Sequence, residues 1–339
     1  MKQINMEEWV ASLIGAACKK PMPVLSFPSI QLMDIGVNRL ISSAQTQAEG
    51  MRLIAQRTDA AAALSMMDLS VEAEAFGSAV RFSDDEVPTV TGRIVSSADD
   101  ARALAVPPVS AGRCGIYVDA IRIAAETIND RPVFAGTIGP FSLAGRLMDV
   151  SEIMLNCYDD PEMVHITLDK TTRFIIDYIM AYKQAGANGV VIAEPLAGIL
   201  SPGLADEFSS GYIKRIVDAV QDDDFIAVYH NCGNNTPLLI DSILNVGAGM
   251  YHFGNAVDMR GILELMPPNI IAMGNIDPVS QFRNGTPGSV RQAALGLLEQ
   301  CGGYKNFIIS SGCDIPPLSK WENIDAFFTA VGDFYHGRG

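Results

Sequence analysis

The sequence predicts one α/β domain, residues 1–339, folded as a (β/α)8 TIM barrel, and three observations support this prediction. Eight short apolar runs recur along the chain, each bounded by Gly, Pro, Asn or Asp. The segments between the runs have apolar residues every three or four positions, as expected of crossover helices between parallel strands. Polar residues collect at the carboxyl ends of the runs, where barrel enzymes hold their chemistry.

Each predicted strand is a mostly apolar run that ends near a polar residue or a turn former. In chain order these strands are residues 22–27, 62–68, 132–139, 189–195, 225–231, 249–255, 269–277 and 307–314. The helical pattern is clearest in residues 160–186 and 209–221. An open, doubly wound sheet would also alternate strands and helices, and the polar residues at the strand ends favour closure into a barrel instead.

Two segments lie outside the strand and helix repeat. Residues 1–20 are predicted to be an N-terminal helical extension, because Trp9, Leu13 and Ile14 fall on one helical face that would pack on the body. Residues 70–131 form an insertion between the second and third strands, with a hairpin-like stretch at 81–95. We expect this insertion to pass over one end of the barrel.

Composition limits the classes of partner and the compartment. A formal net charge of −15 disfavours binding to nucleic acid or to an anionic membrane, because both would repel such a surface. The six cysteines are scattered without the close spacing of a disulfide framework, which favours a reducing compartment. Glu7 and Glu8 precede the first apolar stretch, where a signal peptide would be basic. We therefore expect a cytoplasmic protein with a small-molecule or protein partner.

A candidate metal site lies at the end of the fifth predicted strand. His230 and Cys232 stand two residues apart, so on an extended strand their side chains point to the same face. Cys313 follows the eighth strand and would reach the same barrel mouth. Three protein ligands with an open fourth position are typical of catalytic zinc, which soft thiolates favour. The alternative is a hydrogen-bonded core histidine beside cysteines that serve as small apolar residues.

The charge of this site indicates a type of reaction. Zinc held by two thiolates and a neutral imidazole has a net charge near zero, so it would polarise a carbonyl weakly. A thiol at the open position would lose its proton and remain nucleophilic. The predicted chemistry is alkyl transfer to sulfur.

Several segments resemble a known superfamily over essentially the whole chain. HNCGN, GNIDP, GCDIP, MMDLSVEAEAFG and GTIGPFSLAG are similar to segments of uroporphyrinogen decarboxylase and the corrinoid-dependent methyltransferases. The histidine-x-cysteine pair with a later cysteine resembles the methylcobalamin:coenzyme M methyltransferase branch, in which these residues bind zinc. The resemblance implies that His230, Cys232 and Cys313 are metal ligands and catalytic residues. It also implies a methylated corrinoid on a carrier protein as methyl donor, and a thiol such as coenzyme M as acceptor.

Other polar strand ends would line the funnel of such an enzyme. Asp68, Asn255 and Asp277 are the predicted corrinoid-binding residues. Glu194 is a candidate fourth zinc ligand when no thiol is present, or else a carboxylate that bonds backbone or ligand groups.

Two alternative functions stay open at this point. The decarboxylase branch uses no metal and grips the carboxylates of a tetrapyrrole with an arginine-rich segment at the first strand, whereas PVLSFPSIQLMDIG offers no arginine there. Asp68 aligns with an aspartate that the decarboxylases also use, so that position does not separate the branches. The second alternative is a corrinoid- or thiol-binding barrel without turnover.

Overall fold

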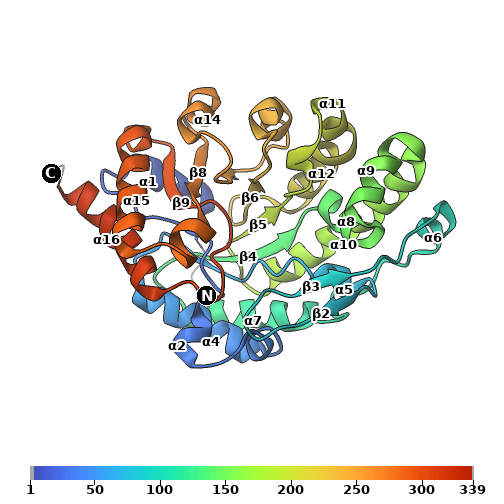
Figure 1. Cartoon of the computed structure of the whole chain (residues 1–339), viewed down its shortest axis with the longest axis horizontal. Helices are drawn as coiled ribbons and strands as arrows, with labels where there is room; N and C mark the ends of the chain where they lie inside the picture. The colour runs from blue at the N-terminus through green and yellow to red at the C-terminus, as the bar shows by residue number, and fades with distance from the viewer. Residues whose placement is uncertain (1–3, 338–339) are drawn as a thin grey trace.

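A computed structural model describes residues 4–337, which contain a curled parallel sheet surrounded by helices (Figure 1). The seven strands lie in the sheet in the order in which the chain forms them, and each pairs in parallel with the next. They are β1 (Ala63–Leu64), β4 (Val133–Ile138), β5 (Gly189–Ala193), β6 (Ile226–Asn231), β7 (Met250–Phe253), β8 (Ile271–Ile276) and β9 (Phe307–Ser311). The first three residues of the predicted extension lie outside the described range.

The strands are apolar along their whole length because both faces of the sheet are covered. Every residue of β4, β5, β6, β7 and β9 is buried. Parallel sheets have this property since crossover helices pack on one face and the barrel interior fills the other. The continuous apolar runs of the sequence are therefore explained by burial.

The prediction of eight regular strands was wrong by one. Residues 22–27 form no strand, although they occupy the gap between β9 and β1. Met22 N donates to Ile309 O at 3.0 Å, and the neighbouring Pro21 O accepts from Ala61 N at 2.9 Å. The physical reason is that Pro21 and Pro23 have no backbone N–H and interrupt a hydrogen-bond ladder. The segment bridges the two edges of the sheet without strand geometry.

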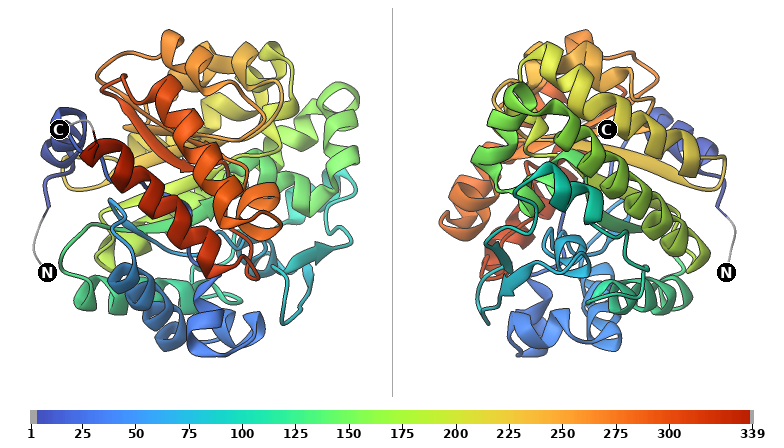
Figure 2. Two further views of the ribbon diagram at one scale, coloured as in Figure 1. Left: turned by 60° about the vertical axis from the view of Figure 1, so that its left-hand side comes forward. Right: turned by 90° about the vertical axis from the view of Figure 1, so that its right-hand side faces the viewer.

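Helices from the last and first parts of the chain are also neighbours in the outer layer (Figure 2). The C-terminal helix α16 (Trp321–His336) lies against α4 (Ala44–Arg57) from the first quarter of the chain. Arg57 pairs with Asp325 at 2.6 Å, and its guanidinium lies 4.8 Å from the centre of the Trp321 ring. Closure of both the sheet gap and the helix layer supports the barrel over an open sheet.

The remaining helices begin and end with ordinary signals. In α10 (Pro161–Gln184), for example, Asp160 caps the amino end by accepting from Met163 N at 3.2 Å. The other α-helices are α1 (Met6–Gly15), α2 (Ser29–Met33), α3 (Val37–Ile41), α5 (Val71–Ala75), α6 (Ala98–Ala103), α7 (Cys114–Thr127), α8 (Pro140–Met148), α9 (Val150–Asp159), α11 (Pro202–Ala205), α12 (Gly211–Val220), α13 (Ile240–Leu244), α14 (Met259–Leu265) and α15 (Pro287–Cys301). Shorter or wider turns are η1 (Ala197–Ile199), η2 (Asp206–Ser210), η3 (Thr236–Leu239) and η4 (Pro278–Arg283).

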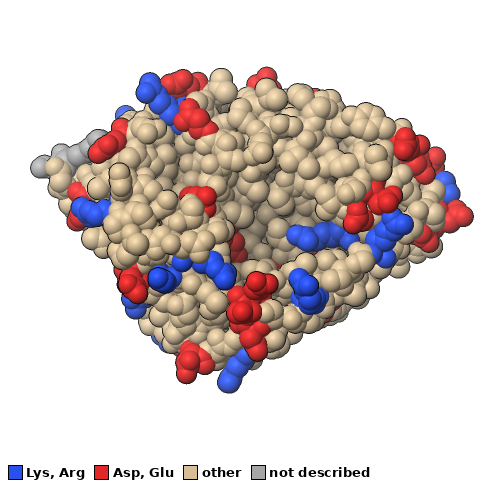
Figure 3. Space-filling view, viewed as in Figure 1, with Lys and Arg blue, Asp and Glu red and all other residues tan. Residues whose placement is uncertain are grey.

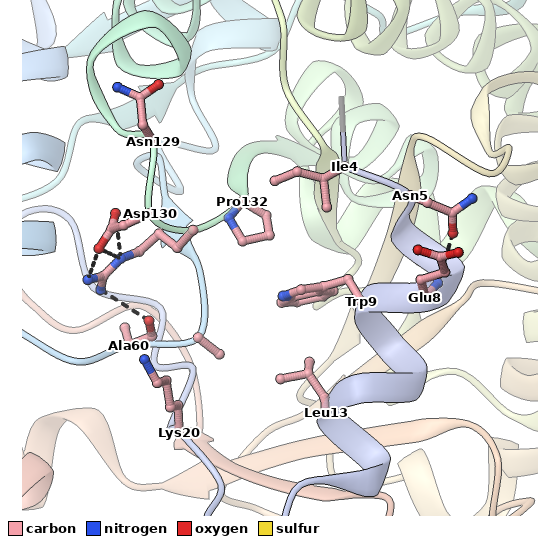
Figure 4. A pocket seen from close by; sticks show the side chains of 12 residues that line it. Ile4, Asn5, Glu8, Trp9, Leu13, Lys20, Ala60, Asn129, Asp130 and Pro132 are labelled. Atoms are coloured by element: carbon pink, nitrogen blue, oxygen red, sulfur yellow. Dashed lines mark hydrogen bonds and ion pairs between the residues drawn. The ribbon is translucent and has the colours of Figure 1, made fainter. Parts of the chain in front are cut away.

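Helix α1 covers the amino-terminal end of the barrel. The Trp9 ring lies 5.7 Å from the Phe134 ring at the start of β4, and Met6 N donates to Asp223 O at 2.6 Å. A pocket of about 520 Å³ remains between α1 and the strand starts, with Trp9 and Leu13 on one side and Lys20 on the other (Figure 4). This pocket is at the opposite end from the predicted site.

The part of residues 70–131 that projects from the barrel is shorter than the sequence predicted. Its hairpin pairs β2 (Ala79–Arg81) with β3 (Thr89–Thr91), near the predicted position. Its last part, however, is α7, which packs beside α4 in the outer helix layer. Only the part before α7 leaves the barrel. Among the described residues no helix has the length and apolar character needed to cross a membrane.

Candidate metal centre

His230, Cys232 and Cys313 come together at the carboxyl ends of the strands. One ligand atom from each lies within 4.8 Å of the others. His230 is in β6, Cys232 follows the end of β6, and Cys313 stands two residues beyond β9. Because β7 and β8 lie between β6 and β9 in the sheet, the curl of the barrel brings the three together. These three residues form a candidate metal site, which we call the metal centre.

Two glycines leave room for the cysteines. A Cβ at Gly254, after β7, would overlap the Cβ of Cys232. A Cβ at Gly312, beside Cys313, would lie 2.7 Å from the backbone nitrogen of Asn255, which is closer than real Cβ contacts. The loops after β6, β7 and β9 can therefore approach each other only with glycine at these two positions.

One ring nitrogen of His230 has no hydrogen-bond partner. Nδ1 lies 2.6 Å from Nδ1 of His252 and 3.2 Å from the carbonyl oxygen of His252. Nε2 is buried and makes no hydrogen bond within the described part of the chain. Buried polar atoms nearly always have a partner, so an orphaned imidazole nitrogen next to two sulfurs fits a missing ligand.

The two thiols lie close enough to affect each other's ionisation. Hydrogen bonding to Cys313 lowers the pKa of Cys232 below its ordinary value. The same contact, together with burial, raises the pKa of Cys313 to about 12. A bound cation would favour the thiolate form of both.

Sequence reasoning missed His252, which is fully buried in β7. Its Cα pairs in register with that of His230 across the β6–β7 ladder. Burial and the neighbouring His230 hold the pKa of His252 well below its usual range. Its presence in an apolar run, as one of only four histidines in the chain, was the available signal.

Glu194 follows β5 and is fully buried, but it is not part of the metal centre. Its carboxylate accepts from Phe141 N at 3.0 Å and from Ser142 N at 2.6 Å, at the amino end of α8. Burial raises its pKa to about 7. Both oxygens therefore accept from backbone N–H groups at the helix terminus, and a role of Glu194 as fourth ligand stays a prediction.

Comparison with known proteins gives the family. Residues 31–334 match the sequence model of the family described as uroporphyrinogen decarboxylase (URO-D). The chain belongs to the URO-D family. The resemblance inferred from the sequence motifs is thereby confirmed at the level of the superfamily.

Relatives within the URO-D family have two different names. The chain is 30% identical over 262 residues to the methylcobamide:CoM methyltransferase MtbA of Methanosarcina acetivorans, covering 76% of this chain and 75% of the relative. It is 27% identical over 295 residues to uroporphyrinogen decarboxylase of Pseudomonas aeruginosa, covering 81% and 80%. A solved structure of a methyltransferase from Methanosarcina mazei superposes with a TM-score of 0.85 over 99% of this chain and all of that one, at 23% identity. The solved structure supports the barrel fold.

Asp68 is part of a second cluster, and its predicted role in corrinoid binding stays a prediction. One of its carboxylate oxygens accepts from Arg113 and, at 2.7 Å, from the hydroxyl of Tyr117, while the other accepts from the hydroxyl of Ser70 at 2.6 Å. Arg113 also pairs with Glu74 at 2.6 Å. We call these five residues the Arg113 cluster. Its arginine comes from the insertion, and two carboxylates already neutralise it.

Asn255 and Asp277 lie past the ends of β7 and β8, as predicted, but outside the metal centre. Asn255 is exposed and packs against Gly312. Asp277 is half-buried, and its carboxylate accepts from Val279 N and Ser280 N, both at 2.9 Å, at the start of η4. Their predicted role in corrinoid binding stays a prediction.

The surface of this molecule is hollowed at the centre of one face (Figure 3). Charged side chains of both signs gather along the lower and right-hand parts of the rim, and the wall above the hollow is mostly uncharged. The insertion hairpin lies on the same face in Figure 1. This face is therefore open enough for a second molecule to approach.

Proposed function

We propose that the chain is a zinc-dependent methyltransferase that moves a methyl group from a methylated corrinoid, on a carrier protein, to a thiol such as coenzyme M. The observation that supports this most strongly is the convergence of His230, Cys232 and Cys313, with the Nε2 of His230 left without a hydrogen-bond partner in residues 4–337. Two sulfurs and one imidazole are a soft donor set of the kind that zinc prefers. Three donors leave the fourth position for substrate.

The residues of the metal centre fit this role on chemical grounds. Cys232 and Cys313 lie together and would both give up their protons to a cation, while His230 offers a neutral nitrogen. When bound, zinc with these ligands would keep an acceptor sulfur as a nucleophilic thiolate. The barrel wall fixes the three side chains, since His230 is buried, Cys232 directly follows β6 and Cys313 stands two residues beyond β9.

Methyl transfer then requires an in-line approach from the open face. The sulfur–carbon bond forms as the carbon–cobalt bond breaks, and the bonding pair stays on cobalt. A corrinoid is a large, flat group, so its methyl face must reach the hollow of the barrel without obstruction. The relatives named methylcobamide:CoM methyltransferase support this reaction and coenzyme M as acceptor. Six free cysteines and the acidic surface agree with a cytoplasmic enzyme.

A tetrapyrrole carboxylyase is the second candidate, because other relatives are named uroporphyrinogen decarboxylase. The segment PVLSFPSIQLMDIG at residues 23–36 lacks arginine, and Arg113 is already paired with Asp68 and Glu74. A polycarboxylate substrate would thus find little free positive charge at these positions. The donor set of the metal centre has no use in that reaction.

One assay separates these functions and a non-catalytic binder. Purified protein is mixed with methylcobalamin and coenzyme M, and the cobalt absorbance is followed while a parallel sample is incubated with uroporphyrinogen. We expect demethylation of the cobalt by protein that contains about one zinc ion per chain. Loss of carboxylates from uroporphyrinogen, binding without a change in cobalt absorbance, or full activity in metal-free protein would contradict the proposal.

A further inference from the structure

We propose that His252 is a positioning residue that fixes the tautomer of His230, so that the Nε2 lone pair of His230 points to the metal. The role of the metal depends on the proposed function, but the tautomer is a property of the chain without metal. The inference follows from the directions of five hydrogen-bonding contacts inside the barrel.

The first step concerns the outer nitrogen of His252. Its Nε2 lies 2.8 Å from the carbonyl oxygen of Ser311, which can only accept. It also lies 2.9 Å from the hydroxyl of Ser310, whose own proton goes to the carbonyl oxygen of Met22 at 2.8 Å. Both neighbours of Nε2 are therefore acceptors, and Nε2 of His252 carries a proton.

The second step concerns the contact between the two imidazoles. A neutral His252 with a proton on Nε2 has a lone pair on Nδ1. Nδ1 of His230 lies 2.6 Å from that lone pair and 3.2 Å from the carbonyl oxygen of His252. Since both groups accept, Nδ1 of His230 must donate. The proton of His230 is then on Nδ1, and Nε2 keeps its lone pair.

The third step connects this relay to the fold. His230 and His252 are both buried and face each other in register on β6 and β7. The hydrogen bonds that set the tautomers therefore join only groups of the protein. Ser310 is on β9, and Met22 belongs to the segment that fills the gap in the sheet. The irregular segment thus supplies the last acceptor, and the chain of bonds crosses the barrel interior.

The expected consequence is tighter metal binding. Groups that hold a ligating histidine in one tautomer and orientation typically change metal affinity by about 10- to 100-fold when they are removed. A buried histidine that merely fills space would alter stability when replaced, but it would not set which nitrogen of His230 is protonated. The tautomer is therefore the readout that separates the two roles.

The first experiment uses the wild-type chain freed of metal and labelled with ¹⁵N-histidine. Long-range ¹H–¹⁵N spectra distinguish the two neutral tautomers of each histidine ring. The variants His165→Gln and His336→Gln identify the signals of those two rings among the four in the chain. We expect the Nδ1–H form for His230 and the Nε2–H form for His252. Protonation of His230 on Nε2 in this sample would overturn the inference. This result does not depend on whether zinc is the physiological metal.

The second experiment compares two variants at His252 by competition for Zn²⁺ with a chromophoric chelator. His252→Phe removes the acceptor, and we expect zinc affinity to fall about 10- to 100-fold. His252→Asn can place an amide oxygen near the former Nδ1 and should restore part of the affinity and the Nδ1–H form of His230. Equal affinity of wild type and the Phe variant would contradict the proposal, as would an Asn variant with His230 protonated on Nε2. If the wild-type protein bound no zinc, the proposed function would be wrong. The tautomer measurement would still test the inference about His252 on its own.

Discussion

Two groups of polar side chains lie past the carboxyl ends of the strands, and they differ in how far their hydrogen-bonding groups are satisfied. In the Arg113 cluster, both oxygens of Asp68 accept hydrogen bonds, and the guanidinium of Arg113 donates to two carboxylates and to a serine hydroxyl. In the metal centre, the Nε2 of His230 has no hydrogen-bond partner within the described part of the chain, and the two thiols lie next to each other. The first cluster satisfies its own polar groups, whereas the second presents a donor set that suits a cation.

The contrast indicates that the Arg113 cluster has a structural role and the metal centre a chemical one, although both lie past the carboxyl ends of barrel strands. A buried ion pair that is fully hydrogen-bonded holds its own elements together, here the insertion and the end of β1. A buried donor set with an unused lone pair has a free-energy cost that a bound metal would remove. The following predictions test whether the two clusters really have these separate roles.

The largest effect is expected from loss of a metal ligand. Cys313→Ala removes one of the three donors of the metal centre, so zinc should no longer copurify with the protein, as measured by elemental analysis. Unfolding of the metal-free protein should change little. Cys18→Ala is the matched control, since Cys18 is exposed and outside the centre. Zinc retained at the wild-type level in the Cys313→Ala variant would remove the distinction between the clusters.

Loss of the central cation of the Arg113 cluster should have the opposite profile. Arg113→Met leaves the fully buried side chain of Asp68 charged and unpaired, which should lower the free energy of unfolding by about 3–5 kcal/mol. Urea unfolding measures the loss, and zinc content per folded chain should not change. Arg102→Met, in an exposed ion pair, is the control and should leave the midpoint where it was. An Arg113→Met variant that is stable but metal-free would mean that the clusters act together.

The carboxyl of Glu72 beside the Arg113 cluster should give the fold a pH dependence. Burial raises its pKa from 4.5 to about 7, against the opposing effect of the hydrogen bonds that one oxygen accepts from Thr137 Oγ1 and Ile138 N. The other oxygen has no hydrogen-bond partner among the described residues. Stability that depends on the protonated carboxyl is fully present below the unfolded pKa and is lost as the pH rises through the folded value, between 4.5 and about 7. Glu72→Gln should flatten this part of the stability curve in urea unfolding. An unchanged slope would show that Glu72 does not titrate there.

A small effect is expected at Asp277, which the sequence suggested as a corrinoid-binding residue. Asp277→Ala removes the cap of η4 and should lower stability by about 1 kcal/mol in thermal unfolding. Zinc content should stay at the wild-type value because Asp277 is not in the metal centre. The KM for methylcobalamin decides the role of Asp277. A higher KM would support corrinoid binding, and an unchanged KM would mean that Asp277 only caps η4.

The features that the sequence predicted are mainly those that depend on residues close together in the chain. The alternation of strands and helices is local, so the barrel could be predicted, and residues 22–27 failed as a strand because Pro21 and Pro23 break the ladder. The sequence could predict that His230, Cys232 and Cys313 lie close together, because the carboxyl ends of parallel strands meet at the same end of a barrel. Arg113 could not be assigned to Asp68, since they are 45 residues apart and joined through the insertion.

The partner of His230 was equally out of reach. His252 faces His230 because of the register between β6 and β7, which period-two patterns do not specify between two parallel strands. Likewise, Glu194 satisfies the rule that polar residues end barrel strands, but its carboxylate turns to the amino end of α8. Strand-end position therefore predicts which residues reach the mouth and leaves their partners undetermined.

X-ray absorption at the zinc edge tests the central claim most directly. For the purified protein the account predicts a first shell with two sulfurs at about 2.3 Å and an imidazole nitrogen at about 2.0–2.1 Å. Addition of coenzyme M should add one more sulfur at a similar distance. A shell of nitrogen and oxygen alone, or a shell that coenzyme M leaves unchanged, would contradict the claim that His230, Cys232 and Cys313 hold zinc for a thiol acceptor.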